Sequence, residues 1–100
     1  MTEYRVGSLK IAKAGEPQMT SIGERDVALF MCRGKVVATS GQCPHNEGPL
    51  SEGEVDGTVL TCPWHGWQFD LVTGECLEDD TIFLERFPVR IDGDDIMVML

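Results

Sequence analysis

The chain has few basic residues and no long apolar run, and each of these absences argues against one class of function. It holds 8 Lys and Arg against 17 Asp and Glu, a formal net charge of -9 at pH 7. Nucleic-acid binding is therefore not expected, because phosphate repels this charge and no basic stripe is present. The longest apolar run, Val27 to Cys32, is far too short to cross a bilayer. The acidic surface serves either solubility or attraction to a basic patch on a partner.

The N-terminal residues also lack targeting features. They contain neither an apolar signal core nor a twin-arginine pair. We therefore expect a soluble cytoplasmic protein that does not associate with a membrane. In a reducing cytosol, the four cysteines are expected to be metal ligands or free thiols rather than disulfides.

No window carries a capped helical period, and short alternating runs separated by turn residues predict an all-β fold. The length suits a single domain spanning residues 1-100. A short turn is the most that residues 8-14 indicate. Hairpin turns are expected at Arg33-Gly34 and at Asp92-Gly93. Strands are predicted at 27-32, 35-39, 58-61, 67-70, 87-91 and 96-100, with a Gly- and Pro-rich sub-domain inserted at about 41-74.

Histidine is the scarcest residue with metal chemistry, and both copies lie beside a cysteine. The two clusters are Cys43-Pro44-His45 and Cys62-Pro63-Trp64-His65. Each supplies one soft thiolate and one imidazole, so together they complete the ligand set of a metal centre. No further histidine remains for other chemistry.

Two kinds of metal centre fit these residues. Zinc accepts two Cys and two His, but zinc fingers usually place Cys with Cys and His with His. Here each loop supplies one of each, and side chains at i and i+2 of an extended loop point the same way but are spread apart. That spacing favours a binuclear [2Fe-2S] centre with two thiolates on one iron and two imidazoles on the other. A zinc-stabilised binding module remains the alternative, and a colourless protein would identify it.

At these residues the sequence resembles the Rieske iron-sulfur family, specifically its small ferredoxins. The match includes Cys43-Pro44-His45, Gly48-x-Leu50-Ser51-x-Gly53, Cys62-Pro63-Trp64-His65-Gly66-Trp67-x-Phe69-Asp70 and Thr73-Gly74. The resemblance implies an antiparallel β sandwich or barrel whose inserted sub-domain holds one Rieske [2Fe-2S] cluster on two loops. Cys43 and Cys62 would bind the inner iron, and His45 and His65 the outer iron.

Departures from the high-potential branch of that family predict a low potential. That branch carries an extra disulfide whose cysteines would match Gly48 and Trp64 here. It also places hydroxyl groups at the positions of Trp67 and Phe69. Fewer hydrogen bonds to the cluster sulfurs leave the reduced state less stabilised, so we expect a midpoint of roughly -150 mV.

The sequence also predicts roles for the residues around the ligands. Gly48, Gly53 and Gly66 would let backbone N–H groups approach the cluster. Trp64 and Trp67 are expected to pack as large rings that shield the cluster from water. The other interpretation, compatible with the first, is that Trp64 forms a flat apolar docking rim together with Pro44, Asn46 and Gly66. Cys32 is expected to be a buried small hydrophobe and Cys76 an incidental thiol in a polar loop.

A substrate reaction on this chain alone is not expected, and no catalytic residue is predicted. The chain has no spare histidine for a second iron and no Gly-rich dinucleotide fingerprint. The resemblance implies a one-electron carrier between an NAD(P)H-dependent flavoprotein reductase and a terminal aromatic-ring-hydroxylating dioxygenase. The alternative within electron transfer is a small subunit of another redox complex, such as a nitrite reductase.

Overall fold

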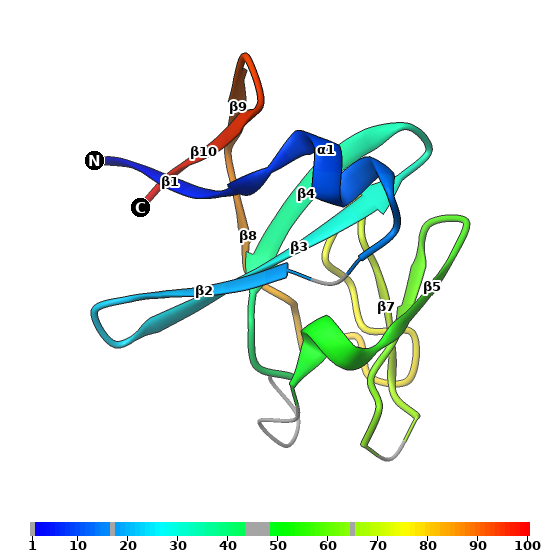
Figure 1. Ribbon diagram of the computed structural model, residues 1–100. Helices are drawn as coiled ribbons and strands as arrows, with labels where there is room; N and C mark the ends of the chain where they lie inside the picture. The colour runs from blue at the N-terminus through cyan, green and yellow to red at the C-terminus, as the bar shows by residue number, and fades with distance from the viewer. Residues whose placement is uncertain (1, 17, 44–48, 65) are drawn as a thin grey trace.

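The computed structural model describes residues 2–16, 18–43, 49–64 and 66–100 (Figure 1). Within these residues the chain forms three antiparallel sheets, in the orders β1-β10-β9, β2-β3-β4-β8 and β5-β6-β7. The all-β antiparallel fold is confirmed. In chain order the elements are β1 (Glu3–Ser8), α1 (Leu9–Lys13), β2 (Gln18–Ile22), β3 (Arg25–Cys32), β4 (Lys35–Ser40), the 3-10 turn η1 (Leu50–Glu52), β5 (Glu54–Asp56), β6 (Val59–Thr61), β7 (Gln68–Asp70), β8 (Arg86–Phe87), β9 (Val89–Asp92) and β10 (Asp95–Met99).

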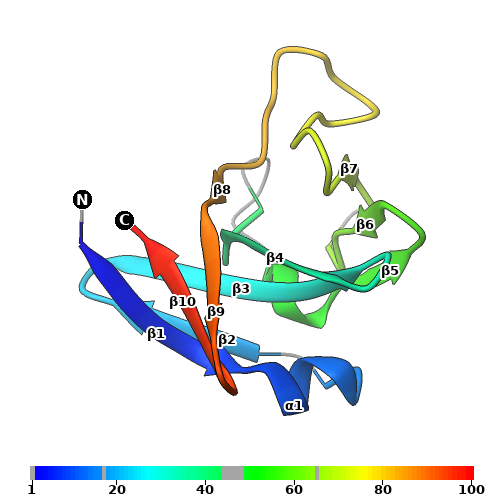
Figure 2. The same cartoon turned by 90° about the horizontal axis from the view of Figure 1, so that it is seen from above.

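Strand β3 lies between two hydrophobic cores, which explains its unbroken apolar sequence. Val27 and Leu29 pack with Val6, Ile96 and Val98 of β1 and β10. The alternate residues of β3 belong to the other core, whose buried members are Ala28, Phe30, Cys32, Cys43, Leu50, Leu60, Cys62, Phe69, Leu71, Cys76 and Leu84. Because side chains alternate along a strand, one β3 face supports each core. Figure 1 shows β1 and β10 on one side of β3 and β5 and β7 on the other, and Figure 2 shows β1 and β10 crossing β3 toward the end away from β5.

Both predicted hairpin turns are present. Arg33 and Gly34 have φ values of 51° and 80°, and two successive positive φ angles are typical of the tight turn that matches strand twist. The turn at Asp92-Gly93 joins β9 to β10, with Asp92 opposite Asp95. Local turn chemistry therefore determines both registers.

The strand expected at 87–91 is divided, which corrects the sequence-based prediction. Phe87 pairs with Ala38 of β4, whereas Val89 pairs with Val98 of β10. Pro88 between them has no N–H to donate, so the ladder breaks there and the chain changes sheets.

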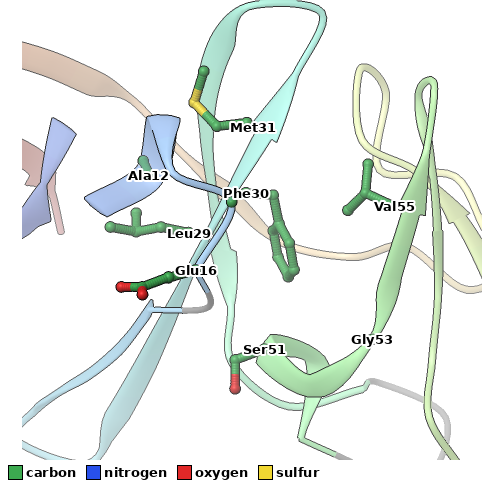
Figure 3. Close-up of a pocket in the computed structure, with 9 residues that line it drawn as sticks. Ala12, Glu16, Leu29, Phe30, Met31, Ser51, Gly53 and Val55 are labelled. Carbon is green, nitrogen blue, oxygen red and sulfur yellow. The ribbon is translucent and has the colours of Figure 1, made fainter. Parts of the chain in front are cut away.

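An open cavity is lined by residues of α1, β3, η1 and β5. It has a volume of about 270 Å³, and its lining includes Phe30, Ser51 and Val55 together with Ala12 of α1. Figure 3 shows Phe30 and Val55 facing each other across it.

Among the described residues, none of the helices has the length and apolar character needed to cross a lipid bilayer.

Candidate metal centre

The first ligand loop leaves the end of β4 and returns to η1. Its base is closed by a bridge between Gln42 and Pro49 and by the Leu50 N–H, which donates to the Gly41 carbonyl at 3.0 Å. Leu50 is fully buried and anchors the returning chain in the core. The loop is therefore held at both ends next to Cys43.

The second ligand loop connects β6 to β7, as the sequence predicted. The Cys62 N–H donates to the Trp67 carbonyl at 2.7 Å, directly beyond the Thr61–Gln68 pair of the ladder. Leu60 and Phe69 face each other across this ladder and are fully buried. The sheet pairing thus fixes where Cys62 leaves the core.

The two loops bring the Cys43 and Cys62 side chains together. Their exposed fractions are 0% and 1%, and both belong to the core that contains Leu50 and Phe69. Burial raises the pKa of the Cys62 thiol; the Trp64 backbone N–H opposes this, and the neighbouring Cys43 thiol reinforces it by hydrogen bonding and charge repulsion. The structure therefore juxtaposes two predicted ligands from loops that are separate in sequence.

This thiol pair fits one iron of a cluster. Two buried thiolates side by side repel each other, and a bound cation removes both the repulsion and the protons. No disulfide joins the four cysteines, all of which lie in the described part of the chain. The donor set on this side of the site is therefore two thiol sulfurs, as an inner iron requires.

The other two predicted ligands, His45 and His65, lie outside the described residues, as do Pro44, Asn46 and Gly48. The assignment of His45 and His65 as cluster ligands depends on the sequence pattern.

The two tryptophans of the second ligand loop, Trp64 and Trp67, lie in different environments. Trp64 is 50% exposed, whereas Trp67 is partly buried against the core.

Two of the described glycines have different structural reasons. Gly66 has a φ of 71°, in the left-handed region of backbone conformation that glycine adopts most easily. Gly53 has a packing role, because an added Cβ would overlap the Thr61 carbonyl of β6.

The two remaining cysteines are both buried, with Cys32 as expected and Cys76 contrary to expectation. Each has an exposed fraction of 5% and belongs to the same core as Cys43 and Cys62. Cys76 was predicted to lie in a polar loop, but its segment pairs with β7 through a bridge to Phe69. Its neighbours Glu75 and Leu77 are both exposed, and because Leu77 is apolar the sequence has no polar alternation here that would predict the buried thiol.

The comparisons with known proteins agree with this architecture. The Rieske [2Fe-2S] domain family matches residues 2–88. The biphenyl dioxygenase ferredoxin subunit of a Pseudomonas species is 35% identical, over 98% of this chain and 92% of that protein. The ferredoxin component of the alkene monooxygenase system of Xanthobacter autotrophicus is 34% identical, over 84% of this chain and 70% of that protein.

A solved structure supports the same assignment. It is a complex of reduced oxygenase and oxidised ferredoxin in carbazole 1,9a-dioxygenase, and it matches with a TM-score of 0.84 and 28% identity, over 96% of this chain and 91% of that one. The family match, the relatives and the paired thiols on two closed loops lead to one conclusion: the chain belongs to the Rieske [2Fe-2S] domain family, whose cofactor is one Rieske [2Fe-2S] cluster.

Proposed function

We propose that this protein is a low-potential one-electron carrier that passes electrons from an NAD(P)H-dependent flavoprotein reductase to a terminal Rieske-type aromatic-ring-hydroxylating dioxygenase. The structural observation that carries the proposal is the adjacency of the buried Cys43 and Cys62 thiols. Relatives at 34–35% identity that are named as ferredoxin components of oxygenase systems support the electron-carrier role.

The proposed ligands are Cys43 and Cys62 for the inner iron and His45 and His65 for the outer iron. Bound to these ligands, a [2Fe-2S] cluster would supply one-electron redox chemistry. The protein's part is to hold the two thiolates in a dry core and to close each loop at its base. The proposed ligand loops lie in a sub-domain at about 41–74 of a single domain spanning residues 1–100.

The partner assignment includes a reductase and an oxygenase that are met in turn. Successive docking requires interfaces that form and dissociate quickly, which favours small contact areas. The half-exposed Trp64 beside a proposed ligand suits such a contact, and the net charge of -9 suits a partner with a basic rim. A cytoplasmic location is part of the proposal, because four cysteines without a disulfide suit a reducing compartment.

The alternative roles are not favoured. The relatives reported above are ferredoxin components, which supports neither a nitrite reductase subunit nor a zinc-stabilised binding module. The protein is assigned as a component of an oxygenase system with no catalytic residue of its own.

The test combines spectroscopy with reconstitution. The purified protein should show the visible and electron paramagnetic resonance spectra of a Rieske cluster, and His45→Ala and His65→Ala should each lose them. Cys32→Ala is the matched control, because Cys32 is buried in the same core but is not a proposed ligand. An unchanged spectrum in either histidine variant would refute the ligand assignment. Oxygenase turnover that proceeds equally well without this protein, with every candidate reductase and oxygenase pair, would refute the carrier role.

A further inference from the structure

Glu78 makes a contact at the base of the second ligand loop that the proposed function does not use. Both of its carboxylate oxygens accept the Gln68 backbone N–H, at 3.2 and 3.1 Å. Gln68 is the first residue of β7, immediately after Trp67 and the second ligand loop. A charged side chain is therefore bound to the main chain of this loop.

The carboxylate occupies the place of a strand partner. The segment from Glu75 to Leu77 pairs with β7, since the Asp70 N–H donates to the Glu75 carbonyl at 2.8 Å and the Leu77 N–H donates to the Gln68 carbonyl at 2.9 Å. In an antiparallel ladder, the returning bond from Gln68 would go to the carbonyl of residue 77. The chain bends away after Leu77, and the Glu78 side chain accepts that bond instead.

The same peptide group also contacts Cys62. The carbonyl between Trp67 and Gln68 accepts the Cys62 N–H at 2.7 Å, while the N–H of that peptide donates to Glu78. The result is a continuous chain from the Cys62 N–H, through one peptide, to a carboxylate. Hydrogen bonds in such a chain polarise and strengthen one another.

The Glu78 charge has two consequences that act in the same direction. A negative charge near the cluster opposes the addition of an electron. The polarised Trp67 carbonyl would also hold the Cys62 N–H more firmly, so that this donor would not be available to stabilise the reduced state of a bound cluster.

We propose that Glu78 is a positioning residue for the second ligand loop and that its charge lowers the reduction potential of the cluster through the Trp67–Gln68 peptide. This inference rests on the proposed assignment of Cys62 as a ligand. The proposal applies to Glu78 and not to the other acidic residues of its turn, because their side chains lie outside this chain of hydrogen bonds.

The test is a redox titration of the cluster-loaded protein and three variants. Glu78→Gln keeps an oxygen acceptor and removes the charge, so the cluster should become about threefold easier to reduce at low salt. For a one-electron couple this is a rise in midpoint of about 30 mV. The rise should shrink in 1 M salt, where charges are screened within about 3 Å. Glu78→Ala should also speed amide-proton exchange at Gln68, and Glu78→Gln should largely restore its protection.

Asp80→Asn is the matched control, because it removes the same charge two residues along the same turn. It should leave the reduction equilibrium nearly unchanged, because no described contact joins the Asp80 side chain to the Trp67–Gln68 peptide and an exposed charge without such a contact is largely screened. An unshifted midpoint in Glu78→Gln, or an equal rise in Asp80→Asn, would overturn this inference while leaving the Rieske spectrum and the proposed function intact. Absence of a Rieske spectrum from the wild-type protein would overturn both.

Discussion

The Ser8 hydroxyl donates to the Asp94 carboxylate at 2.6 Å, and this bond ties the end of β1 to the turn before β10. The other Asp94 oxygen accepts the Lys10 N–H at 2.8 Å, and the Asp94 carbonyl accepts the Leu9 N–H. Ser8 also caps the short helix α1 by accepting the Ile11 N–H. The turn between β9 and β10 therefore satisfies N–H groups at the start of α1 that the helix itself leaves unpaired.

Replacing Ser8 by Ala should lower the free energy of unfolding by about 1 kcal/mol, because it removes the helix cap and the bond to Asp94. In a domain of this size that loss corresponds to a fall in melting temperature of about 4–8 °C. Ser21→Ala is the matched control: its hydroxyl also donates to a carboxylate at 2.6 Å, but on the exposed surface. Its effect should stay within about 0.5 kcal/mol. Equal losses in the two variants would show that the Ser8 contact has no special role.

Asp94 should contribute to the acid sensitivity of the fold. Hydrogen bonds from Ser8 and from the Lys10 N–H hold the pKa of this carboxyl below its ordinary value of 3.8. The charged form is therefore favoured by folding. Its contribution is complete above the ordinary value and is lost as the pH falls through the lowered one.

Melting temperatures of the wild type and Asp94→Asn, measured from pH 7 to pH 2.5, test this linkage. The variant should be less stable at pH 7, and the difference should narrow below about pH 4 as the wild-type carboxylate takes up its proton. Glu3, whose pKa is lowered by Arg90, remains in both proteins, so some acid dependence should persist in the variant. A difference that stays constant across this range would contradict the assignment.

Removal of the cluster should destabilise the protein. Each ligand loop begins at one of the two adjacent buried thiols, Cys43 and Cys62, and a metal bound by both thiols would link the two loops. A tightly bound group that binds only the folded state contributes roughly 3 kcal/mol or more. Calorimetry of the cluster-loaded protein and of protein stripped by a chelator under reducing conditions measures the difference. Equal melting temperatures would mean that the two loops are stable without the metal centre.

The cluster should titrate at a low potential, roughly -150 mV. Phe69 is fully buried in the core that holds Cys43 and Cys62, and it has no hydroxyl where the high-potential branch has one. Phe69→Tyr should therefore raise the midpoint by about 60 mV, a tenfold change in a one-electron equilibrium. Phe69→Leu controls for altered packing and should not raise it. A clearly positive midpoint in the wild type would disprove the low-potential prediction.

Much of this protein follows from its sequence alone. The two Cys/His clusters predict a metal site and favour a binuclear iron-sulfur centre over zinc, because the chemistry of such a site depends on residue type and short spacing. The hairpins at Arg33-Gly34 and Asp92-Gly93 follow from local backbone preferences, and the apolar run that ends at Cys32 predicts the strand β3. These features involve neighbours along the chain, so a linear pattern records them.

The tertiary structure decided what depends on residues distant in sequence. It placed Cys43 beside Cys62, buried Cys76 in the same core, and moved the chain between sheets at Pro88. It also brought Asp94 to Ser8 and seated the Glu78 carboxylate on the Gln68 N–H. These contacts arise when sheets pack and loops close, and their partners have no fixed spacing that periodicity or a motif can reveal.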